Sequence, residues 1–151
     1  MNKFKRNLPR PDLVKDEQAL RLGNMIFGEV GGVKGEDAAR MVGSTAINRL
    51  DSKRDKEFGI DMDEVLQKGY YAVKDKDPLN KNPWLRATTT NLSGMEANKY
   101  SKVLDVAHNL FNRIEKPSTS AEFYFKENEA KSLKKKLRKV GSEGEYGLYS
   151  Y

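Results

Sequence analysis

Apolar side chains recur at helical spacing in three long stretches of this chain of 151 residues. Spacings of three and four residues place side chains on one face of an α-helix. The stretches run over residues 16–29, 36–50 and 95–114. Because one domain usually has about 100–200 residues, we expect a single, mainly helical α+β domain.

The beginning of the chain differs from the rest in charge. Residues 1–10 carry four positively charged side chains, and two prolines stand at positions 9 and 11. We therefore expect a basic N-terminal arm over residues 1–15 and the folded domain over residues 16–151. An apolar run of the length found in signal peptides does not follow the basic start, so the sequence predicts no signal peptide.

Shorter patterns predict the elements between and after the three long helices. Asp61 can cap a short helix, and a segment rich in Asp, Asn, Lys and Thr with two prolines is typical of a long loop. The expected elements are a helix over 61–68, a loop over 74–91, a short strand over 121–125 beside a cleft, a basic helix over 127–139 and an extended segment over 141–151.

The amino-acid composition excludes several kinds of catalytic and metal-binding chemistry. The chain has no cysteine and one histidine, so disulfides, thiol nucleophiles and zinc sites built from Cys and His are excluded. We expect no cofactor. There are 28 Lys and Arg against 22 Asp and Glu, a formal net charge of +6. A basic protein is attracted to polyanions such as nucleic acid, anionic lipid or a cell-wall polymer.

Glu29 is the candidate catalytic residue. It lies at the expected end of an apolar helix, between Gly28 and the pair Gly31 and Gly32. A carboxyl group in apolar surroundings has a raised pKa and can act as a general acid. The alternative is a carboxylate that caps the helix or pairs with a lysine.

Aromatic and basic residues offer candidate binding surfaces. Tyr71, Trp84 and Tyr124 could stack on a sugar polymer or a nucleic acid. Aromatic residues of a small domain also commonly belong to the core. The basic stretch 131–139 is either a solvated face or a contact for an anionic polymer.

Five segments, in chain order, carry a resemblance to a known family. Residues 26–32 read Ile-Phe-Gly-Glu-Val-Gly-Gly, and residues 36–49 begin with Glu and end with Asn-Arg. The other segments are Gln-Lys-Gly-Tyr-Tyr at 67–71, Ala-Glu-Phe-Tyr-Phe at 121–125, and Val-Gly at 140–141 followed by Leu-Tyr at 148–149. Together they resemble the cell-wall hydrolases typified by the catalytic domain of spore cortex-lytic enzymes.

The resemblance implies a lysozyme-like fold and cleavage of the MurNAc-GlcNAc glycan strand of peptidoglycan, generally as a lytic transglycosylase. Glu29 matches the catalytic glutamate of the family. We expect Glu36, Tyr71, Trp84 and Tyr124 to contact substrate. Glu36 is also the candidate second carboxylate if the reaction is hydrolytic. No metal is expected, because acid catalysis on a glycan needs none.

The resemblance also suggests a setting for the protein. A phage lysin or a virion-associated muralytic protein would reside in the virion or the host cytoplasm before release and act in the periplasm or outside the cell. Its partners would be peptidoglycan and phage tail or core proteins, with no membrane insertion.

Two other interpretations stay open. Gly31 and Val33 stand where the family has Arg and a second Glu, which favours a structural virion component that keeps the fold without turnover. The interpretation as a nucleic-acid-binding protein rests on charge alone. It is weaker than the cell-wall hydrolase and the structural virion component.

Overall fold

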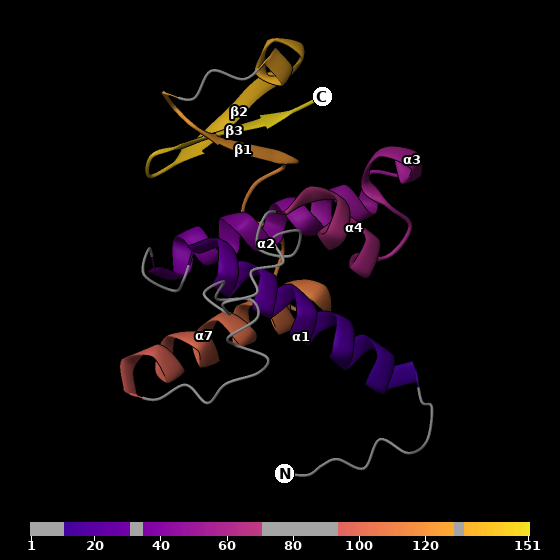
Figure 1. Cartoon of the computed structure of the whole chain (residues 1–151), viewed down its shortest axis with the longest axis vertical. Helices are drawn as coiled ribbons and strands as arrows, with labels where there is room; N and C mark the ends of the chain where they lie inside the picture. Colours follow the sequence, from indigo (N-terminus) through magenta and orange to yellow (C-terminus); the bar gives the residue numbers. More distant parts are fainter. Residues whose placement is uncertain (1–10, 31–34, 71–93, 129–131) are drawn as a thin grey trace, which may run out of the picture.

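The computed structural model describes residues 11–30, 35–70, 94–128 and 132–151. These residues form a mainly helical α+β fold with a small antiparallel sheet, as the sequence predicts (Figure 1). The elements are α1 (Pro11–Val30), α2 (Gly35–Asp51), α3 (Asp55–Phe58), α4 (Met62–Gly69), α7 (Gly94–Phe111), β1 (Phe123–Lys126), the 3₁₀ helix η1 (Ser132–Lys136), β2 (Arg138–Glu143) and β3 (Tyr146–Ser150).

Helix α2 is central to the structure. In Figure 1 it lies between the α1 and α7 helices on one side and the sheet on the other, and it also contacts α4. Every residue from Met41 to Ile47 is buried, although a helix at a surface would bury only one face. The residues from Met41 to Ile47 are correspondingly apolar or small all the way round the helix.

Small residues allow the helices to approach closely. A Cβ atom added at Gly43 would lie 2.8 Å from a methyl carbon of Leu110 and 3.0 Å from one of Ile26. At Gly23 of α1 it would lie 2.6 Å from a methyl carbon of Leu104. A larger residue at either position would force these side chains to shift, so glycine favours the close packing of α1, α2 and α7.

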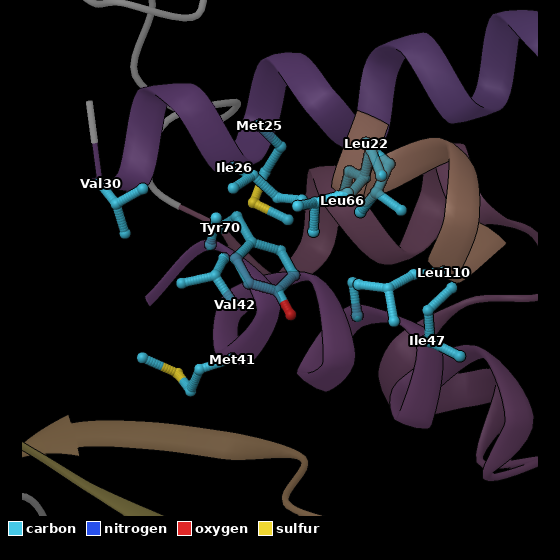
Figure 2. Close-up of a cluster of buried hydrophobic side chains, with 14 of the residues drawn as sticks. Leu22, Met25, Ile26, Val30, Met41, Val42, Ile47, Leu66, Tyr70 and Leu110 are labelled. Carbon is cyan, nitrogen blue, oxygen red and sulfur yellow. The ribbon is translucent and has the colours of Figure 1, made fainter. Parts of the chain in front are cut away.

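The helices enclose one hydrophobic core, part of which Figure 2 shows in close-up. The side chains labelled in Figure 2 come from α1, α2, α4 and α7 and from the residue that follows α4, and the core also includes Phe58 of α3, Phe123 of β1 and Leu148 of β3. The residues labelled there are Leu22, Met25, Ile26, Val30, Met41, Val42, Ile47, Leu66, Tyr70 and Leu110.

The sheet has the strand order β1-β3-β2, and both pairings are antiparallel. Strands β2 and β3 form a hairpin in which Glu143 pairs with Tyr146. Gly144 begins the two-residue loop with a φ of 57°, a left-handed conformation that favours glycine. The central strand β3 is therefore paired along both edges.

Several boundaries match the expectations. Helix α2 agrees with the predicted range to within one residue at each end. Asp61 caps α4, and its carboxylate accepts a hydrogen bond from the Glu64 amide at 2.9 Å. Strand β1 falls where a strand was expected. The predicted loop over 74–91 lies outside the described residues.

Other boundaries differ. Helix α1 begins at Pro11, so it includes residues 11–15 that we assigned to the basic arm. Proline suits the first helical position, because its φ is already helical and its missing N–H has no partner there. Helix α7 ends at Phe111 rather than at residue 114, and Arg113 follows it with a left-handed φ of 62°.

The predicted basic helix over 127–139 is wrong. Among the described residues of this range, 127–128 and 132–139, the structure has the short 3₁₀ helix η1 and the start of β2 at Arg138. Helical spacing fits Leu133, Leu137 and Val140. In the structure, all three are partly buried against the core. At the end of the range, Arg138 and Lys139 pair with Ser150 and Tyr149 of β3, a distant contact that no local pattern encodes. In the part of the chain that is described, no helix is long and apolar enough to cross a membrane.

The core predicts a clear contrast between two leucines. Leu110 is fully buried, whereas Leu20 on α1 is 40% exposed. We expect Leu110→Ala to lower the free energy of unfolding by about 2–5 kcal/mol, since it removes buried methyl groups and leaves a cavity. Leu20→Ala should cost less than about 1 kcal/mol. Urea unfolding followed by circular dichroism measures both, and equal losses would contradict this packing.

Candidate functional site

Glu29 meets a tyrosine from the far end of the chain. Glu29 lies in the last turn of α1 and is partly buried. The hydroxyl of Tyr124 on β1, 95 positions further along, donates a hydrogen bond of 2.5 Å to its Oε1 atom. Two residues that the sequence singled out for different reasons are thus in direct contact.

A second tyrosine lies close to this pair. Tyr70 follows α4 and is almost completely buried, and its hydroxyl lies 2.8 Å from the hydroxyl oxygen of Thr45 on α2. Thr45 donates its one hydroxyl hydrogen to the carbonyl of Val42 at 2.7 Å. Thr45 thus links Tyr70 to α2.

The surroundings of the two phenols raise their pKa values. Burial is the largest cause of the raised pKa of Tyr124, which lies well above 10, and the charge of Glu29, the phenol of Tyr70 and the hydrogen bond to Glu29 add to it. Burial likewise raises the pKa of Tyr70, against the opposing effects of Arg49 and Thr45. Both phenols therefore stay neutral near pH 7, and Tyr124 keeps its proton for the bond to Glu29.

Arg49, near the end of α2, is the cation that lies close to Tyr70 and Tyr124. It is only 7% exposed. Its guanidinium carbon lies 4.7 Å from the ring centre of Tyr70, 4.9 Å from that of Phe123 and 5.3 Å from that of Phe58. Contacts of a guanidinium with aromatic faces are cation–π interactions.

Hydrogen bonds to backbone carbonyls fix the same guanidinium. Nε of Arg49 donates to the carbonyl of Glu122 at 2.7 Å, and Nη1 lies 3.4 Å from the carbonyl of Gly69. No carboxylate of the described residues forms an ion pair with Arg49. Sequence reasoning used the Asn-Arg pair only for the resemblance and did not assign Arg49 a role.

Glu36 lies elsewhere. It is exposed in the first turn of α2 and lines a cavity of about 270 Å³ between α2 and α7. Lys99 and Lys102 of α7 line the same cavity, and Glu29 does not. The structure therefore gives no support to Glu36 as a partner of Glu29.

The structure does not describe the remaining predicted site residues. Tyr71 and Trp84 lie outside the described residues, and so do the departures from the family at Gly31 and Val33. Within the described ranges, no group of three or more His, Cys, Asp or Glu side chains could hold a metal ion.

The basic stretch is partly engaged with the sheet. Lys139 forms an ion pair of 2.9 Å with Glu127, and Arg138 donates to the carbonyl of Tyr151 at 3.0 Å. Lys134 lies over the ring of Tyr149. Of these three contacts, the ion pair of Lys139 with Glu127 offsets a positive charge of the stretch.

Comparisons with protein-family models, with curated proteins and with solved structures found no match to this chain.

The raised pKa of Tyr124 predicts a loss of stability in alkali. In the unfolded chain a tyrosine loses its proton near pH 10, whereas the folded pKa of Tyr124 lies well above that value. The unfolded state then binds fewer protons than the folded state, so the stabilisation is complete below pH 10 and falls as the pH rises above it.

We expect Tyr124→Phe to make this decline less steep in urea unfolding at pH 10–12, because the substitution removes the phenol that titrates late. From pH 7 to 9 the difference in stability between wild type and variant should be constant, which is the internal control. An unchanged slope above pH 10 would contradict the buried hydrogen bond to Glu29.

Proposed function

We propose that this chain cleaves the glycan strand of peptidoglycan, with Glu29 as the general acid. The observation that carries the proposal is the hydrogen bond from the neutral phenol of Tyr124 to the Glu29 carboxyl group. It fixes the position of a carboxyl group at a helix end, beside aromatic side chains that could contact a sugar. The choice of peptidoglycan as the substrate rests on the resemblance of the sequence to the spore cortex-lytic family.

The proposed reaction needs one carboxyl group. Protonated Glu29 donates its proton to the glycosidic oxygen as the bond from that oxygen to the anomeric carbon breaks. The new carboxylate then accepts the hydrogen bond of Tyr124, and bonds to charged acceptors are the stronger ones. Tyr124 therefore stabilises Glu29 most after the proton has left, which favours the acid step.

The second half of the reaction uses the same residue as a base. The Glu29 carboxylate takes the proton of the muramic acid 6-hydroxyl, whose oxygen bonds to the anomeric carbon and closes a 1,6-anhydro ring. Ordinary glycosidases use two carboxyl groups about 5–9.5 Å apart. Glu36 lines a cavity whose lining does not include Glu29, so Glu36 gives no support to a second carboxyl group beside the acid.

The proposal includes a lysozyme-like arrangement and a phage setting, as a lysin or a virion-associated enzyme. The mainly helical fold with a small sheet is compatible with that arrangement. A structural component of a phage virion, with the same fold and no turnover, is the second candidate. The sequence departures at Gly31 and Val33 favour it.

Digestion of purified peptidoglycan tests the proposal. Wild type should release muropeptides with 1,6-anhydro ends, and Glu29→Gln should be slower by a factor of about 100 to 10,000, since it cannot donate the acid proton. Mass spectrometry identifies the products. Reducing ends in place of anhydro ends would overturn the transglycosylase reaction, and no release from several wall types would favour the structural candidate.

Two further variants separate catalysis from folding. Tyr124→Phe should slow the reaction about tenfold to a hundredfold, because a hydrogen bond to a charged group contributes about 1.5–3 kcal/mol. Asp105→Asn removes an exposed carboxylate of α7 and should leave the rate unchanged. Thermal melting of each variant shows whether it is folded.

A further inference from the structure

A second cavity has Arg49 in its lining. Its volume is about 270 Å³, and residues from α2, α3, α4, β1 and η1 line it. Its walls are largely apolar, from Phe58, Phe123, Phe125 and Leu133. Ligand sites usually measure about 300–1,000 Å³, so this cavity is just below that range and has room only for a small ligand.

Arg49 lines this cavity, and one nitrogen of its guanidinium has no hydrogen bond to the described residues. Nε and Nη1 donate to backbone carbonyls, and Nη2 has no hydrogen bond to the described residues. Every buried side-chain nitrogen and oxygen atom of the described residues has a partner. Nη2 must therefore reach solvent, and Arg49 is a residue of the cavity lining.

Charges of the lining favour an occupant with one negative charge. Two cations, Arg49 and Lys68, line the cavity together with one carboxylate, Glu57, so the lining has a net charge of +1. Glu57 accepts a hydrogen bond from the hydroxyl of Tyr151 and forms no ion pair with Arg49 among the described contacts. Glu122, whose carbonyl binds Arg49, has its carboxylate bonded to Ser150 at 2.9 Å.

We propose that this cavity binds a small organic carboxylate, with the carboxylate on Arg49 and Lys68 and an apolar group against the three phenylalanines. A buried guanidinium is costly without a counter-charge, and such a ligand would supply one. The free acid and the C-terminus of a short apolar peptide share this chemistry. The site does not include Glu29, so the proposal goes beyond the proposed function and does not depend on it.

Calorimetric titration with two pairs of probes tests the proposal. The free acid is represented by phenylacetate and its neutral control phenylacetamide. The peptide C-terminus is represented by acetyl-alanyl-alanine and its C-terminal amide. We expect at least one acid to bind and its amide to bind at least about tenfold more weakly, because the amide lacks the charge that Arg49 would pair with. The acid that binds identifies the source of the ligand.

Three variants check where the acid binds. Leu133→Trp fills the cavity and should abolish binding. Lys68→Gln removes an exposed cation and should weaken binding about twofold to fivefold. Arg49→Lys should weaken it at least about tenfold, because lysine lacks the planar group that stacks on the rings. Lys135→Gln, an exposed lysine of η1 outside the lining, is the matched control.

The outcomes separate this proposal from the enzymatic one. Equal binding of an acid and its amide, no binding of either acid, or wild-type affinity in Leu133→Trp would each overturn the carboxylate site. Because Leu133 and Lys68 are not fully buried, these variants remain informative if Arg49→Lys fails to fold. Binding that persists in Glu29→Gln would show that the site is independent of the proposed acid.

Discussion

The buried guanidinium of Arg49 joins the helices to the sheet. It contacts rings of α3 and β1 and the ring that follows α4, and it binds the carbonyls of Gly69 and Glu122. Burying a guanidinium without a carboxylate is costly. Each cation–π contact stabilises the buried side chain by about 0.5–2 kcal/mol. The hydrogen bonds to the two carbonyls satisfy two nitrogens of the guanidinium. Four elements therefore need to be in place together for this side chain to be stable inside the fold.

The contact between Glu29 and Tyr124 depends on this junction. Asn48, next to Arg49, donates to the carbonyls of Thr119 and Ala121 at 2.8 and 2.7 Å. These bonds and the bond from Arg49 to the Glu122 carbonyl fix the chain just before β1 against α2. The position of Tyr124 follows, since it lies two residues further on. The pair Asn48-Arg49 thus positions a site to which it contributes no hydrogen bond.

Sequence reasoning predicted what local patterns encode and missed what distant contacts decide. The spacing of apolar residues predicts α2, and Asp61 marks the start of α4, because both signals act within a few residues. The pattern also places Glu29 at a helix end. The same apolar spacing wrongly predicted a helix over 127–139. The end of that range belongs to β2 and pairs with β3. Arg49 was missed because a long charged side chain is usually exposed, and nothing nearby in the sequence shows that three rings would surround it.

Arg49 is common to the candidate acid site and the second cavity, which raises the question of whether one affects the other. The charge of Arg49 lowers the pKa of both Tyr70 and Tyr124, but burial outweighs that effect in each. A carboxylate bound beside Arg49 would offset its charge and raise both pKa values further. Both phenols are already neutral near pH 7, so this rise would not change their protonation. The hydrogen bond from Tyr124 to Glu29 would persist, and occupancy of the cavity would leave the acid site unchanged by this route.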